Sequence, residues 1–227
     1  MSLGTRRDQV QRRILQAAGE VFAARGYQQA TIREICRRAD VNGAAVNYYF
    51  REKERLYIAA VKHARSLIEE RLPLPKWPKD TPAERKLELY IETFLGRLLS
   101  GETAAWQTRL LMREIIEPTR ACAEMVQESF RPFFAILLEI LRELLPAETP
   151  EPHLHQTGFS IVAQCVFYRA HGHVVEMIIG EQERRTYFDL PQLARHITHF
   201  SLSAVHAASD CGWAPVKSWR GSKEPAE

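Results

Sequence analysis

The sequence has few residues of the kinds that stabilise small secreted or fibrous proteins. Its four cysteines lie far apart and form no C-x-x-C pair, so neither a disulfide framework nor a zinc knuckle is indicated. Eleven glycines and twelve prolines in 227 residues exclude a collagen-like or low-complexity chain. No apolar run reaches the roughly 18–20 residues of a membrane span, and charge follows the N-terminus where a secretory signal has its apolar core. We therefore expect a cytoplasmic protein with no membrane segment and with reduced cysteines.

Motifs of the common enzyme classes are missing as well. The chain contains no phosphate loop, dinucleotide glycine fingerprint, H-E-x-x-H motif or nucleophile elbow. His196 and His199 share a helix face, but no carboxylate or thiol stands at the spacing that a metal site needs. Cys36 and Cys165 fit either oxidant-sensing thiols or small buried residues. We expect no catalytic residue, no metal site and no cofactor.

Positive charge is concentrated in the first part of the chain. Residues 1–62 contain twelve Lys and Arg against six Asp and Glu, a net charge of +6. Since the whole chain has a net charge of +3, the remaining 165 residues have a net charge of −3. This asymmetry favours an N-terminal module that binds a polyanion, joined to a body of different purpose. A solvated charged surface is the alternative, because an excess of charge alone does not identify a binding element.

Apolar residues recur at spacings of three and four almost throughout, which predicts an all-α fold of about nine helices. The first helix starts near Val10 and ends at Gly26, and a capping box at 31–34 starts a second helix that runs to about Ala39. A turn over 40–43 leads to a third helix of only two turns, up to Phe50. A long fourth helix then continues to about residue 72.

A proline-rich segment over 73–80 separates this N-terminal module from a larger helical domain. We assign residues 1–62 to the module and 73–210 to the larger domain, and we expect a flexible tail over 211–227. Pro132 should kink or split a long helix in the larger domain, because its ring clashes with the preceding turn. The periodic segments there are 81–101, 103–117, 119–145, 155–179 and 190–209, with Gly101 expected to end the first and Asp189 to cap the last.

The second and third helices, joined by a short turn and packed on the first, form a helix-turn-helix pattern that can enter a DNA major groove. Small residues at the start of the third helix allow a close approach to base edges, and Asn47 can hydrogen-bond a base or a phosphate. Tyr48, Tyr49 and Lys53 suit phosphate contact. Alternatively, the aromatic residues pack the three-helix core, which we expect for Phe50 and for one of the tyrosines.

Residues 10–63 resemble the N-terminal domain of the TetR family of bacterial transcriptional regulators. The resemblance is carried by Phe22-Ala-Ala-Arg-Gly-Tyr27, Thr31-Ile-Arg-Glu-Ile35 and Tyr48-Tyr-Phe-Arg-Glu-Lys53. It implies a homodimer, usually a repressor, that binds double-stranded operator DNA and releases it when a small molecule binds the C-terminal domain. The candidate DNA-binding residues are Thr31, Arg33, Asn42, Gly43, Ala44, Ala45, Asn47, Tyr48, Tyr49 and Lys53.

The third helix departs from the common family pattern. Where the family has Lys-Gly-Thr-Leu-Tyr-Tyr-His-Phe, this chain has Gly43-Ala-Ala-Val-Asn-Tyr-Tyr-Phe50, so one base-contact position lacks a side chain and Asn47 replaces a tyrosine. This variant, together with the segment Arg113-Glu-Ile-Ile-Glu-Pro118, resembles the CecR-like subgroup. The departures leave the mode of binding unchanged and alter the expected operator sequence.

The C-terminal helices carry more apolar surface than peripheral helices need, so we expect them to form a four-helix bundle with a second copy, although burial within one monomer is the alternative. The predicted dimer contacts are Val162, Val166, Ala170, Val174, Ile197, Phe200 and Ala204. Arg113 is expected either to anchor a polar ligand group or to pair with Glu117 four residues later. The predicted lining of a ligand pocket is Phe94, Trp106, Leu110, Arg113, Phe133, Phe134, Phe159 and Tyr168.

A second function fits the same N-terminal module. An architectural DNA-binding protein that needs no effector would have the same helix-turn-helix pattern and the same charge. The two functions differ in the larger domain, because only a ligand-responsive regulator requires a cavity there.

Overall fold

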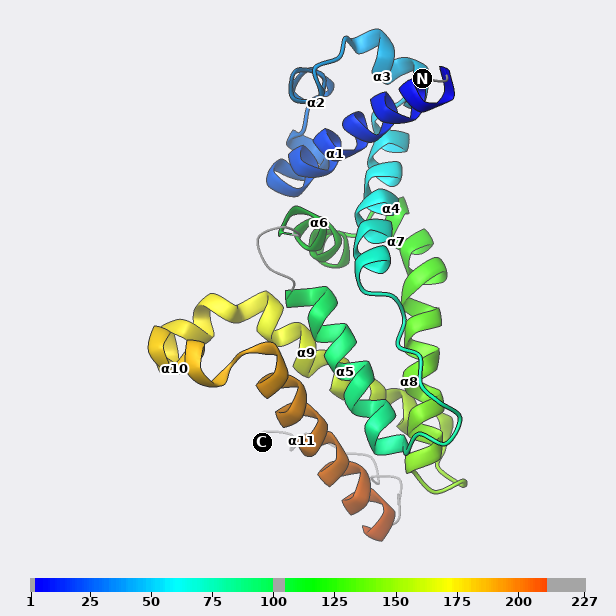
Figure 1. Ribbon diagram of the computed structural model, residues 1–227, viewed down its shortest axis with the longest axis vertical. Helices are drawn as coiled ribbons and strands as arrows, with labels where there is room; N and C mark the ends of the chain where they lie inside the picture. Colours follow the sequence, from blue (N-terminus) through cyan, green and yellow to red (C-terminus); the bar gives the residue numbers. More distant parts are fainter. Residues whose placement is uncertain (1–2, 100–104, 212–227) are drawn as a thin grey trace, which may run out of the picture.

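The computed structural model describes residues 3–99 and 105–211, and every regular element within these ranges is helical, which confirms the predicted all-α fold. The molecule is elongated, with the short helices α2 and α3 at one end and the long C-terminal helices at the other (Figure 1). No helix in the described ranges combines the length and the apolar character needed to cross a lipid bilayer.

The N-terminal module consists of α1 (Leu3–Gln29), α2 (Ile32–Ala39) and α3 (Gly43–Phe50). The backbone leaves helical geometry at Gly26, where φ is 77°, a conformation that a residue with a Cβ rarely adopts. The Thr31 hydroxyl accepts a hydrogen bond from the amide of Glu34 and so caps α2 as predicted. The first helix begins seven residues before the predicted start at Val10.

Helix α4 (Lys53–Arg71) leads out of the module, and the segment with the prolines connects it to α5 (Ala83–Leu99). Helix α6 (Ala105–Ile116) then ends before Pro118. The predicted stop of the preceding helix at Gly101 lies outside the described residues.

The long helix predicted over 119–145 is divided. It consists of α7 (Arg120–Met125), a single π-helical turn η2 (Val126–Phe130) and α8 (Arg131–Leu144). Pro132 stands in the first turn of α8, a position where a helix tolerates a proline. The wider π-helical turn lies immediately before it.

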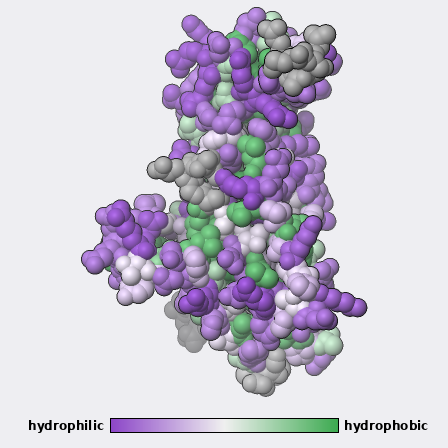
Figure 2. Space-filling model, viewed as in Figure 1, coloured by the Kyte–Doolittle hydropathy of each residue, from purple (hydrophilic) through white to green (hydrophobic). Residues whose placement is uncertain are grey.

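The chain ends with α9 (Glu151–Ile179), α10 (Glu181–Tyr187) and α11 (Leu190–Cys211). The amide of Gln192 donates to the Asp189 carboxylate, which caps α11 as predicted. Helix α10 was not predicted. Its seven residues project from the body of the molecule and are mainly hydrophilic, as Figure 2 shows, so no apolar periodicity reveals them. The predicted tail lies beyond the described residues.

The first of two hydrophobic clusters joins the N-terminal module to part of the larger domain. Its centre is formed by Phe22 of α1 and Leu56 of α4, and Leu110 of α6 and Met125 of α7 are buried in the same cluster. An added Cβ at Gly19 would lie 2.0 Å from the indole of Trp106, so α1 and α6 approach closely only because position 19 has no side chain. The packing therefore crosses the predicted division between residues 62 and 73.

The second cluster holds the C-terminal helices together. Helices α5, α8, α9 and α11 contribute fully buried side chains, among them Leu87, Leu137, Ile197 and Cys165. Burial raises the pKa of the Cys165 thiol to about 12, so the thiol stays protonated at neutral pH. Since the thiolate is the reactive form, this burial favours a packing role for Cys165 over oxidant sensing.

A buried carboxyl group connects α4 to the turn between α6 and α7. Glu114 is 0% exposed, and its side chain accepts hydrogen bonds from the Tyr57 hydroxyl at 2.5 Å and from the Thr119 amide at 2.6 Å. Burial, followed by the bond to Glu114, raises the pKa of Tyr57 well above its usual range, so the phenol remains a donor. The Thr119 hydroxyl also donates to Glu114 and accepts from the amide of Ala121.

Replacing Glu114 with Ala should lower the free energy of unfolding by about 3 kcal/mol, because it leaves buried donors on Tyr57 and Thr119 without an acceptor. The matched control is Glu117→Ala, whose exposed carboxylate pairs only with Arg113 at 3.7 Å and should change stability by less than about 0.5 kcal/mol. Urea unfolding of the full chain followed by circular dichroism measures both. Equal, small losses for the two variants would contradict the role of the Glu114 contacts.

Candidate functional site

Helix α3 is presented at the end of the molecule farthest from the C-terminal helices (Figure 1). Val46 and Phe50 are buried against the module, which fixes the helix and turns the opposite face to solvent. The Asn42 carboxamide oxygen accepts from the amide of Ala45 at 2.9 Å and caps the helix. A Cβ added at Gly43 would meet nothing within 4 Å, so open space surrounds the start of α3.

The candidate DNA-binding residues lie on or beside α2, α3 and the start of α4, and we call the part of the molecule that they occupy the candidate DNA-binding surface. Phe50 is buried in the core, Tyr49 is half-buried, and Tyr48 is 64% exposed, so the three aromatic residues divide between packing and surface. Ala45 and Lys53 are also half-buried. The exposed members of the set are Thr31, Arg33, Asn42, Gly43, Ala44, Asn47 and Tyr48.

Lys53 stands at the start of α4, beside this surface. Its ammonium group donates to the carbonyl oxygen of Gln28 at 3.2 Å and lies 4.9 Å from the centroid of the Tyr27 ring. Both contacts hold the charge close to the loop before α2.

Arg7 of α1 contacts this surface and was not among the predicted residues. Its guanidinium donates to the Tyr48 hydroxyl, and the Tyr49 hydroxyl donates to the carbonyl oxygen of Arg7. The only sequence signal is the pair Arg6-Arg7 before the first apolar periodicity, and it gains meaning only once α1 is seen to begin beside α3.

A cavity of about 220 Å³ lies between the two ends of the molecule. Its walls come from α4, α5, α6, η2, α8 and α9, and aromatic rings form much of them. The rings of Tyr90 and Phe133 stack with their centroids 4.4 Å apart, and Phe134 and Phe159 stack at 4.7 Å. A concave, largely apolar space with few polar groups is typical of small-molecule sites.

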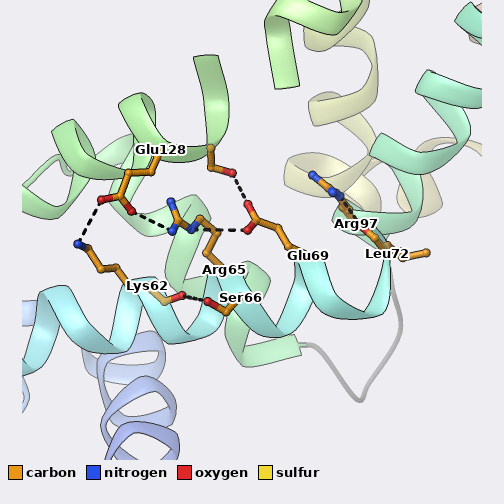
Figure 3. A network of polar contacts seen from close by, with 8 residues as sticks. Lys62, Arg65, Ser66, Glu69, Leu72, Arg97 and Glu128 are labelled. Carbon is orange, nitrogen blue, oxygen red and sulfur yellow. Dashed lines mark hydrogen bonds and ion pairs between the residues drawn. The ribbon is translucent and has the colours of Figure 1, made fainter. Parts of the chain in front are cut away.

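Three charged side chains line the cavity, namely Arg65 and Glu69 of α4 and Arg97 of α5. Figure 3 shows how they are held: Arg65 lies between Glu69 and Glu128, and the Arg97 Nε donates to the carbonyl oxygen of Leu72 at 2.8 Å. The guanidinium of Arg97 also lies 4.8 Å from the ring centroid of Phe133. Burial lowers the pKa of Arg97, and the nearby Glu69 opposes that shift.

Half of the predicted pocket residues line this cavity and half lie elsewhere. Phe94, Phe133, Phe134 and Phe159 are in the lining. Trp106 instead packs against Gly19, and Leu110 is buried in the first cluster. Arg113 contacts Gly26 and forms the ion pair with Glu117 that the sequence offered as its alternative. Tyr168 packs against the second cluster beside Phe188.

The predicted dimer residues also separate by location. Ala170, Val174, Phe200 and Ala204 are exposed on α9 and α11, and Phe200 is 60% exposed. Ile197 is 0% exposed inside the second cluster, so it is removed from any surface that a second copy could contact. Val162 and Val166 are half-buried and line the cavity.

Comparison with known families decides between the possible classes of protein. Residues 14–60 match the family described as bacterial regulatory proteins, tetR family. Residues 83–205 match the C-terminal domain of the HTH-type transcriptional dual regulator CecR, a match that covers more than half of the chain. The chain belongs to the TetR family. Its C-terminal domain is of the CecR type, in agreement with the resemblance seen in α3 and α6.

Relatives of this TetR family member extend over most of its length. The fatty acid metabolism regulator protein of Bacillus subtilis is 25% identical over 193 residues, covering 85% of this chain and 94% of the relative. The dual regulator CecR of Shigella flexneri is 28% identical over 172 residues, covering 71% of this chain and 76% of the relative. These relatives are transcriptional regulators and not enzymes.

Solved structures share the fold of this TetR family member. A TetR-like regulator from Rhodococcus sp. RHA1 has a TM-score of 0.64 at 16% identity and covers 87% of this chain and 96% of its own. HlyIIR, a hemolysin II transcriptional regulator, has a TM-score of 0.56 at 23% identity, with 85% and 98% covered. The protein is thus a DNA-binding transcriptional regulator with the helix-turn-helix module at one end.

Proposed function

We propose that the protein is a homodimeric repressor that binds a palindromic operator through α3 and releases it when a small molecule enters the cavity. The observation that carries the proposal is that α4 belongs to both sites. Its first residue, Lys53, is part of the DNA-binding surface, and its last two turns supply Arg65, Ile68 and Glu69 to the cavity wall.

A ligand can act on DNA only by favouring one arrangement of the molecule over another. Helix α6 gives the cavity Leu111, Met112 and Ile115, while Leu110 on its other side is buried with the N-terminal module. A ligand that shifts α4 or α6 therefore also shifts the α3 that packs on α4. The cavity favours this function over an architectural DNA-binding protein, which needs no such space.

Two copies are required because one α3 contacts only a few base pairs. A pair of modules on one face of the duplex must lie about one helical turn, roughly 34–36 Å, apart. The exposed apolar faces of α9 and α11 can set this distance by pairing with the same faces of a second copy around a two-fold axis. A regulator of this kind works where the chromosome lies, so the proposal includes a cytoplasmic location.

The lining favours an effector with an apolar body and an acidic group. The largely apolar lining contains two guanidinium groups, those of Arg65 and Arg97, and one carboxylate, that of Glu69, while the other partner of Arg65, Glu128, lies outside the lining. Glu69 already accepts a hydrogen bond from Ser129, and the buried Nη1 of Arg65 has no hydrogen-bond partner among the described residues. An acidic group placed at this end gains charge-assisted hydrogen bonds, whereas a cationic group meets like charge.

Selection of bound duplexes from random DNA should recover a palindrome whose half-site centres lie about one helical turn apart. In binding assays on that operator, Lys53→Ala should weaken binding to all sequences and lower the salt slope by about one for each protomer. Asn47→Ala should change the preference at a single position in each half-site. Lys79→Ala removes the same charge from the exposed segment between α4 and α5, and it should change neither the affinity for DNA nor the salt slope. Failure to enrich any sequence would contradict the proposal.

Phe200→Glu should convert a dimer into a monomer, because it places a charge in the centre of the proposed apolar interface. Sedimentation velocity at about 10 µM measures the state of each protein. Ile116→Glu is the matched control, since that residue is also exposed and apolar but stands at the end of α6. A wild-type chain that sediments as a monomer at this concentration would remove the dimer from the proposal.

Octanoate, octanol and octylammonium test the effector class, because they share one chain and differ only in the head group. Isothermal titration should give octanoate an affinity at least about tenfold above that of octanol, and octylammonium should be weakest. Arg97→Met should abolish the preference. Octanoate should also lower the affinity of the protein for its operator. Equal binding of all three probes would contradict this part of the proposal, and so would binding of octanoate with no change in operator affinity.

A further inference from the structure

Residues 7–9, near the start of α1, are exposed and belong to neither hydrophobic cluster. The helix begins at Leu3, whereas the first fully buried residue of the module is Ile14 and Val10 is only partly buried. Figure 1 shows this N-terminal end lying beside α3 at the extremity of the molecule. An exposed helical extension next to the DNA-binding surface requires a reason other than core packing.

Arg7 connects this extension to α3. Its Nη2 donates to the Tyr48 hydroxyl at 2.5 Å, and its guanidinium carbon lies 5.7 Å from the centroid of the same ring. The Tyr49 hydroxyl donates to the Arg7 carbonyl oxygen at 3.4 Å, so two successive tyrosines of α3 contact one residue of α1. Tyr48 is otherwise exposed, and these contacts restrict where its ring can lie.

Unlike Arg25 and Arg38 of the same module, Arg7 has no carboxylate partner among the described residues. Arg38 pairs with Glu20, and Arg25 with Glu34, so each of those charges faces a carboxylate. Arg7 faces a neutral hydroxyl instead. A guanidinium has five donors in a planar fork, and the bond to Tyr48 uses one of them. The remaining donors suit the geometry of a phosphate group.

We propose that Arg7 is a DNA-contacting and positioning residue: it binds a backbone phosphate beside the groove that α3 enters, and it holds the Tyr48 side chain in place. This inference rests on the proposed binding of DNA by α3. The phosphate contact supplies affinity that does not depend on sequence, and the ordered Tyr48 loses less conformational freedom when DNA binds.

Fluorescence anisotropy with an operator duplex selected by the wild-type protein tests both roles. Arg7→Ala should lower affinity about tenfold on the operator and on unrelated duplexes alike, and reduce the salt slope by about one for each protomer. Arg185→Ala is the matched control, because Arg185 is an exposed arginine on α10, away from α3, that pairs along its own helix with Glu181. Thermal unfolding should be the same for all three proteins, since Arg7 is exposed.

A double-mutant cycle with Tyr48→Phe separates the two roles of Arg7. Removal of the hydroxyl should cost less in Arg7→Ala than in the wild-type background, because the bond that it supports is already lost. Additive losses would overturn the positioning role, and an Arg7→Ala variant with unchanged affinity and salt slope would overturn the phosphate contact. If the wild-type protein binds no selected duplex at all, the proposed function is contradicted. If the wild-type protein binds and Arg7→Ala binds equally well, only the role of Arg7 is contradicted.

Discussion

The packing of α4 against α6 is the constraint on which the rest of the structure depends. Nineteen residues of continuous helix carry α4 from the DNA-binding surface to the cavity, and α6 lies along it with one side in each environment. Glu114 of α6 accepts a hydrogen bond from Tyr57 of α4, and Trp106 at the start of α6 packs against Gly19 of α1. Through these contacts α6 joins α1 and α4 to the wall of the cavity.

This constraint explains why the cavity is located in the middle of the molecule. A site deep among the C-terminal helices would be separated from α3 by the second cluster, whereas the observed cavity has α4 itself as a wall. Close-packed interiors change between discrete arrangements instead of deforming smoothly. In the proposed function, a ligand in the cavity selects one orientation of the DNA-binding module over another.

Periodicity and capping residues predicted most of the helices, because each depends on neighbours within a few positions. Thr31 and Asp189 cap the helices that they were expected to cap, and Pro132 divides a long helix at the expected place. Helix α10 escaped prediction since its seven residues bury no apolar face. Local patterns also could not show that α1 begins beside α3, and so Arg7 was missed.

The sequence was less informative about which apolar face belongs to which core. Phe94 and Phe134 line the cavity, but Trp106 and Leu110, on an equally apolar helix, pack with the N-terminal module. Ile197 shares helix α11 with the exposed Phe200, yet it is buried in the second cluster. Assigning such residues requires the relative placement of helices far apart in the sequence, which helical periodicity does not contain.

The distance between the two α3 helices of a dimer, measured with and without ligand, tests the central claim most directly. A spin-labelled amino acid incorporated at Ala24, an exposed residue of α1 outside the candidate DNA-binding set, reports changes in that separation by double electron–electron resonance. On operator DNA we expect a single narrow distribution, set by half-sites about one helical turn apart, and a displaced distribution when octanoate is bound. An identical distribution in the free, ligand-bound and DNA-bound protein would contradict coupling between the cavity and α3.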